Sequence, residues 1–121
     1  SYYLAKKLLD SVSPSDEKDK ATTFMAEADA NSRFEEGYFH STLSALSSMK
    51  EEDKKEEALL EFSTKFYMKG EFSLAAESII AMKPSDKKDN AALDLSEKLK
   101  EANLHCRGLS DSIRPIYTTT E

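Results

Sequence analysis

The feature that most constrains the fold is the stretch between Lys65 and Asp86, which resembles an earlier stretch of the chain displaced by 33 positions. Apolar residues recur at helical spacing before Gly70 and again after it, and Pro84 follows the second run. Apolar residues three or four positions apart form one face of an α-helix, and glycine permits a tight turn. The stretch therefore predicts two antiparallel helices that meet at Gly70.

The repeat can be followed through most of the chain. Five pairs of identical or similar residues are separated by 33 positions: Gly37 and Gly70, Phe39 and Phe72, Leu46 and Ile79, Met49 and Met82, and Asp53 and Asp86. Three similar charged connectors end at Ala21, Ala58 and Ala91. A period of this length is typical of stacked helical or strand units. The alternative is an irregular helical bundle with coincidentally similar connectors; we expect stacked hairpins.

The apolar periodicity defines where helices are expected. They cover residues 2–12, 17 to about 37, 39–49, 58–69, 72–83 and a segment after Asp86 that reaches Ala102. The charged run 51–57 is assigned to a connector, and about one extra helical turn is expected between Ala21 and Gly37. The repeat also places a turn at Asn103 and a short last helix over about 105–114. Residues 1–115 are thus expected to form one domain of about three hairpins, the first half-present, followed by a disordered tail at 116–121.

Composition narrows the classes of partner. The net charge is −6, which argues against nucleic acid and against anionic membrane surfaces, both of which require a basic face. No apolar run approaches the roughly 20 residues of a membrane span. The start lacks a signal-peptide core because Lys6 and Lys7 interrupt it, and the single Cys106 suits a reducing compartment. These features predict an intracellular protein, cytoplasmic or nuclear.

The second copy of the repeat resembles the tetratricopeptide repeat (TPR). The matching positions are Leu59, Phe62, Ser63 and Phe66 before the turn, then Gly70, Phe72, Ala75, Ile79 and Pro84. Leu59 stands where the family most often has tryptophan, and Pro84 comes about a turn early. In the first copy Asp29 and Arg33 occupy positions expected to be apolar, which would suit a differently phased helix. The resemblance implies an all-α fold of antiparallel hairpins stacked as a short, TPR-like, right-handed α-solenoid.

The resemblance also implies a function. Proteins of this family hold a peptide or helix of another protein in a concave groove lined by the first helix of each hairpin, as adaptors or scaffolds. The corresponding positions are Asn31, Phe34, Glu35, Glu61, Thr64, Tyr67, Met68, Asp94, Glu97 and Glu101. This lining is mostly acidic, with Phe34, Tyr67 and Met68 as apolar anchors. The expected partner segment is therefore basic and apolar. The alternative is that these acids form a solvated helix face.

A second hypothesis assigns the chain a structural or assembly role. The chain begins with the second helix of a hairpin, and Tyr2, Tyr3, Leu4 and Leu8 could pair with another copy in a homodimer or a larger assembly. The alternative is that further protein precedes this segment and covers the same helix.

Neither catalysis nor cofactor binding is expected. His105 and Cys106 are adjacent, so on a helix they point about 100° apart and cannot form a nucleophile–base pair with each other. Glu101 and His105 are spaced like two metal ligands on a helix, but two ligands do not make a site. No phosphate-binding glycine loop is present. The sequence therefore predicts neither catalytic residues nor a metal site.

Overall fold

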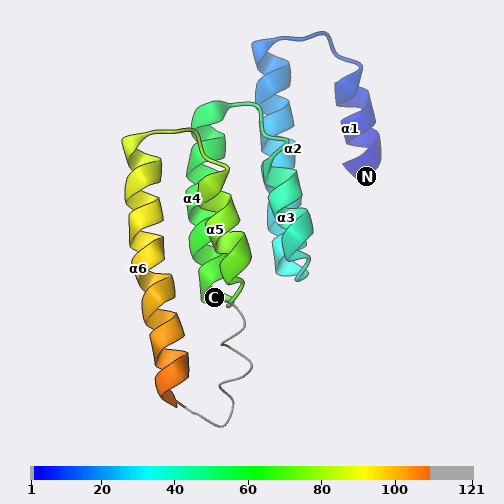
Figure 1. The fold of residues 1–121 in the computed structure, drawn as a ribbon. Helices are drawn as coiled ribbons and strands as arrows, with labels where there is room; N and C mark the ends of the chain where they lie inside the picture. Colours follow the sequence, from blue (N-terminus) through cyan, green and yellow to red (C-terminus); the bar gives the residue numbers. More distant parts are fainter. Residues whose placement is uncertain (1, 110–121) are drawn as a thin grey trace. The chain divides into compact units, whose positions relative to one another are not determined.

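The computed structural model describes residues 2–109, and their side chains as far as Asn103. This part of the chain forms six α-helices and no strand, so the prediction of an all-α protein is confirmed (Figure 1). The helices are α1 (Tyr2–Asp10), α2 (Asp16–Glu35), α3 (Phe39–Leu46), α4 (Glu52–Met68), α5 (Phe72–Ile80) and α6 (Asp86–Leu109). The chain divides into two compact units: the first ends at Lys83 and holds α1 to α5, and the second begins at Pro84 and holds α6.

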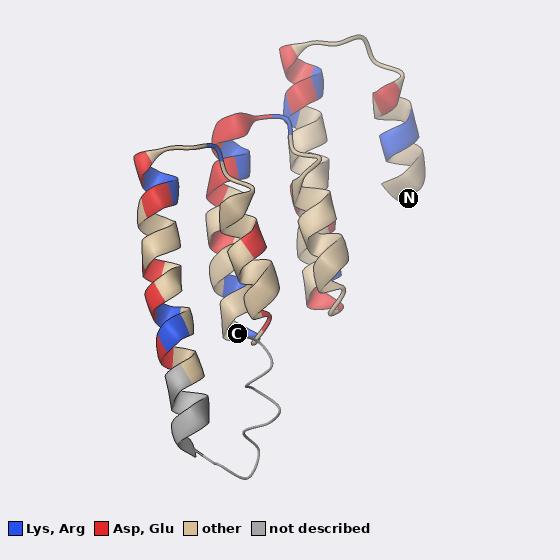
Figure 2. Cartoon of the chain, viewed as in Figure 1, with Lys and Arg blue, Asp and Glu red and all other residues tan. Residues whose placement is uncertain are grey.

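The longer helices begin at acidic segments. The first turns of α2, α4 and α6 all contain aspartate or glutamate, which the positive end of the helix dipole stabilises (Figure 2). The Ser15 hydroxyl accepts the Lys18 N–H at 3.1 Å, and the Ser85 hydroxyl accepts the Lys88 N–H at 3.1 Å. Because acids suit this position, α4 begins at Glu52, and the prediction that 51–57 forms a connector was wrong.

Two helical hairpins form the centre of the first unit. Helix α2 packs along α3, and α4 packs along α5 (Figure 1). Gly37 and Gly70 make the turns with φ of 85° and 80°, values that favour glycine. The Tyr38 N–H bonds the Arg33 carbonyl at 2.8 Å, and 33 positions later the Glu71 N–H bonds the Phe66 carbonyl at 2.8 Å. The predicted turns are confirmed, and they share one geometry.

The far ends of the hairpins are also closed in an equivalent way. The Thr23 hydroxyl of α2 accepts the Lys50 N–H at 2.9 Å. At positions 33 residues later, the Glu56 carboxylate of α4 accepts the Lys83 N–H at 3.2 Å. Each bond ties the end of a second helix to the start of its own first helix. The repeat is therefore present in the hydrogen bonding as well as in the sequence.

Helices α3 and α5, the second helices of the two hairpins, and α1, which is equivalent to them, are shorter than predicted and end in the same way. Helices α1, α3 and α5 stop at Asp10, Leu46 and Ile80 rather than at residues 12, 49 and 83. The N–H groups of Val12, Met49 and Met82 instead bond carbonyls three residues earlier, at 3.0–3.1 Å. This tighter turn ends each helix. Helix α2 has 20 residues and α4 has 17, so α2 is longer by three, close to the extra turn predicted.

Aromatic side chains join the two hairpins. The Phe34 ring of α2 lies 5.7 Å from both Phe62 and Phe66 of α4, measured between ring centroids. Phe39 of α3 lies 6.0 Å from Phe66 in an edge-to-face arrangement. Phe62 and Phe66 are buried, at 1% and 0% exposure. Such pairs add about 0.5–1.5 kcal/mol each to the stabilisation from the area that they bury, so this cluster helps to hold the two hairpins together.

The second unit corrects one expectation. Helix α6 continues through Asn103 to Leu109, so the predicted turn at Asn103 is wrong. Asparagine favours turns but is also tolerated in helices, at a cost of only a few tenths of a kcal/mol (~0.7 at most). Residues 110–114 of the predicted last helix and the predicted tail at 116–121 lie outside the described residues.

Candidate protein-binding site

The outward face of the first helices is the surface where the sequence predicts a groove. On α2 it carries Phe24, Ala28, Asn31 and Glu35, and on α4 it carries Glu57, Glu61, Thr64 and Met68. These eight residues are all exposed, recur every three or four positions, and pair across the repeat at 33 residues. We call this surface the α2–α4 face.

Two large apolar side chains lie open on the α2–α4 face. Phe24 is 74% exposed and Met68 is 78% exposed. Met68 was among the predicted groove residues, whereas Phe24 was not. The signal that could have found Phe24 was its repeat partner Glu57, a charged residue that is rarely buried. The exposed apolar side chains of the face are therefore Phe24 and Met68, of which only Met68 was predicted.

The other two predicted anchors are engaged in packing. Phe34 is half-buried, 5.2 Å from the Phe39 ring, and belongs to the cluster that joins the hairpins. Tyr67 is half-buried and lies 5.3 Å from the Phe72 ring, in the equivalent position of the second hairpin. These rings therefore take part in packing the first helix against the second, and each is only partly exposed.

Carboxylates share the α2–α4 face with the exposed apolar residues. Glu35, Glu57 and Glu61 are exposed on the α2–α4 face. Glu61 pairs with Lys65 at 3.5 Å, and the Lys65 ammonium lies 4.6 Å from the centre of the Phe62 ring. Exposed pairs of this kind contribute about 0–1 kcal/mol and are easily exchanged, so Glu61 can turn to a cation on another protein. The face is acidic with an apolar element.

The remaining predicted groove residues lie on α6. Asp94, Glu97 and Glu101 are all exposed there. Asp94 pairs with Lys98 at 3.3 Å, and Glu97 pairs with Lys100 at 3.6 Å. Because α6 belongs to the second unit, the candidate site consists of residues on α2 and α4 alone.

The predicted self-association residues lie on α1 and are not equivalent. Tyr3, Leu4 and Leu8 are 69%, 62% and 72% exposed. Tyr2 is less exposed: burial raises the pKa of its phenol above the usual value, and the Asp29 carboxylate of α2 raises it further. Asp29 also accepts a bond from Arg33 at 2.9 Å, which holds the pKa of the guanidinium above its usual value. Tyr2 therefore belongs to the contact between α1 and α2.

Asp29 and Arg33, two polar residues at positions that were expected to be apolar, form an ion pair with each other. These two positions are 33 residues before Phe62 and Phe66, and α2 and α4 end at equivalent residues. The two first helices therefore share one phase, and the suggestion of a different phase was wrong. On α4 these positions carry Phe62 and Phe66, which pack against the preceding hairpin. On α2 they carry the Asp29–Arg33 ion pair, which lies beside α1.

Within residues 2–109, no helix is both long enough and apolar enough to cross a membrane. No group of three or more histidine, cysteine, aspartate or glutamate side chains that could hold a metal ion occurs in the described part of the chain. His105 and Cys106 lie beyond the side chains that the structure describes.

No protein-family model, no curated protein and no solved structure matches this chain.

Proposed function

We propose that this chain is a protein-interaction module of the TPR type, an adaptor or scaffold whose hairpins stack as a short right-handed solenoid. The observation that carries the proposal is the pair of open apolar side chains, Phe24 and Met68, set among carboxylates on the α2–α4 face. Buried aromatic and methionine contacts supply much of the binding energy in protein interfaces. The hairpins' shared turns and closing bonds support stacking.

The negative charge of the α2–α4 face indicates which kind of segment would bind there. Glu35, Glu57 and Glu61 favour a segment with lysine or arginine, which they attract and orient. Phe24 and Met68 favour apolar side chains between those cations. A basic amphipathic helix or extended peptide meets both demands. Steering by exposed charges weakens as salt screens them, so binding should weaken at high ionic strength.

The first test compares partner capture by matched variants. Phe24→Ala and Glu61→Lys are expected to reduce recovery of the specific partner by about tenfold or more, because a lost anchor or a reversed charge costs on the order of 1–2 kcal/mol or more. Recovery is measured by affinity capture with quantitative mass spectrometry.

Matched controls lie on α5. Ile80 is 68% exposed and Glu77 is exposed, so Ile80→Ala and Glu77→Lys change apolar area and charge to a similar degree. They should leave recovery unchanged. Equal losses from the α5 variants and the α2–α4 variants would sink the proposal.

Self-association is the second candidate, and one comparison favours it. Leu8 of α1 is 72% exposed, whereas Ala45, its equivalent in α3, is 7% exposed. Copies of the chain could cover this face of α1 in each other. Light scattering over a range of concentrations tests this, and a monomer at every concentration would rule it out.

A further inference from the structure

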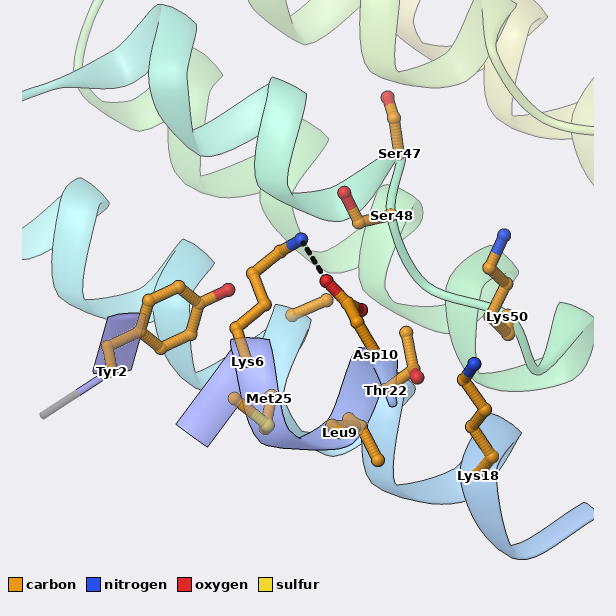
Figure 3. A pocket seen from close by; sticks show the side chains of 11 residues that line it. Tyr2, Lys6, Leu9, Asp10, Lys18, Thr22, Met25, Ser47, Ser48 and Lys50 are labelled. Atoms are coloured by element: carbon orange, nitrogen blue, oxygen red, sulfur yellow. Dashed lines mark ion pairs between the residues drawn. The ribbon is translucent and has the colours of Figure 1, made fainter. Parts of the chain in front are cut away.

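The first unit contains a cavity away from the α2–α4 face. It has a volume of about 510 Å³, is partly open to solvent, and lies between α1, α2 and the turn from α3 to α4 (Figure 3). Its walls include the lysines Lys6, Lys18 and Lys50, the hydroxyl residues Ser48 and Thr22, and the apolar Leu9, Met25 and Ala26. Cavities of about 300–1,000 Å³ with an apolar floor and a few polar groups are typical of small-ligand sites.

The walls are cationic although the chain is acidic. Three lysines face one carboxylate, that of Asp10, in a chain with a net charge of −6. Lys6 pairs with Asp10 at 3.7 Å, and the Lys18 ammonium donates to the Val12 carbonyl at 2.9 Å. Lys50 has no carboxylate at ion-pair distance among the described residues. In Figure 3 the Lys18 and Lys50 side chains lie on the same side of the cavity.

The equivalent end of the second hairpin is built differently. Ser47 and Ser48 correspond to Ile80 and Ala81, each 33 residues later. Lys50 has a lysine counterpart, Lys83, but that residue pairs with Glu52 at 3.6 Å. The same turn thus forms with apolar residues in place of the two serines and with a carboxylate beside the lysine.

We propose that this cavity binds a small organic anion with an apolar portion. Its phosphate or carboxylate group would accept hydrogen bonds from the Lys18 and Lys50 ammonium groups and the Ser48 hydroxyl, and its apolar portion would lie on Leu9 and Met25. Charge-assisted hydrogen bonds are about twice as strong as neutral ones, which favours an anionic head over a neutral one. The proposal is independent of the protein-binding function.

The test is a titration of the full chain by calorimetry and by ¹⁵N NMR with four probes. Octyl phosphate and octanoate share the apolar portion and differ in the head group, octyl glucoside is neutral, and inorganic phosphate lacks the apolar portion. We expect saturable binding of at least one octyl anion, with amide shifts at Thr22 and Ser48. The octyl anion that binds more tightly identifies the head group that the cavity prefers. Octyl glucoside and inorganic phosphate should bind at least about tenfold more weakly, because each lacks one of the two contacts.

Variants locate the binding within the cavity. Lys18→Gln with Lys50→Gln is expected to weaken the octyl anion about tenfold or more. Lys83→Gln with Lys69→Gln removes the same charge elsewhere and should leave binding unchanged. No saturable binding of either anion, equal binding of octyl glucoside, or equal weakening by the two variant pairs would each overturn the proposal. The amide shifts are measured on the unmodified chain, so the test stands even if a variant folds poorly.

Discussion

Phe66→Ala is expected to lower the free energy of unfolding by about 3–5 kcal/mol, the usual cost of removing a buried phenylalanine. Phe66 is fully buried and its ring contacts Phe34, Phe39 and Phe62, at centroid distances of 5.7, 6.0 and 6.2 Å. The substitution removes one ring from the cluster that joins the two hairpins and leaves a cavity between three helices. Urea denaturation measures the change as a lower midpoint at unchanged slope.

The same substitution at Phe24 is the matched control. Phe24 also lies on a first helix but is 74% exposed. Its replacement by alanine removes little buried area and should change the free energy of unfolding by no more than about 0.5 kcal/mol. Similar losses from the two variants would mean that the hairpins are not held together by the Phe66 cluster.

Thr23→Val is expected to cost about 2–4 kcal/mol, although it preserves the shape of the side chain. Thr23 is 1% exposed, and its hydroxyl accepts the N–H groups of Lys50 and Glu51 at 2.9 and 2.8 Å. Valine would leave both donors without this partner, and an unsatisfied buried donor costs about 1–3 kcal/mol. Thermal unfolding measures the loss.

The second hairpin supplies the comparison for Thr23. Glu56 holds the Lys83 N–H through two longer bonds, of 3.2 and 3.4 Å, at a more exposed position. Glu56→Ala should therefore cost only about 0.5–1.5 kcal/mol, because water can replace the carboxylate. A larger loss from Glu56→Ala than from Thr23→Val would contradict this ranking of the two closing bonds.

The turns and the repeat could be predicted from sequence because their causes are local. A glycine with positive φ, an aromatic residue two positions later and a 33-residue spacing define the hairpins without reference to the rest of the fold. Helix ends were harder, because an acidic run suits both a connector and the first turn of a helix; α4 begins at Glu52 for that reason. Asn103 shows the same ambiguity at the other end, since asparagine suits a turn and is tolerated in α6.

The candidate site was harder to predict than the fold because burial depends on neighbouring helices. Phe24 and Phe34 are both aromatic residues on α2, and only the packing of α3 and α4 decides that Phe34 is covered and Phe24 is open. The role of Asp29 also depends on a neighbour, because Tyr2 of α1 lies beside it. Helical periodicity identifies a face but not what covers it.

The central claim is that a partner protein binds the α2–α4 face, and site-specific photo-crosslinking tests it most directly. A benzophenone amino acid is placed at Asn31 or Thr64 on this face, or at Ser44 or Glu77 on α3 and α5, all of which are exposed. We predict one shared cross-linked protein from Asn31 and Thr64, lost when Phe24→Ala is added, and none from Ser44 or Glu77. The same adduct from all four positions, or adducts from α3 and α5 alone, would contradict the claim.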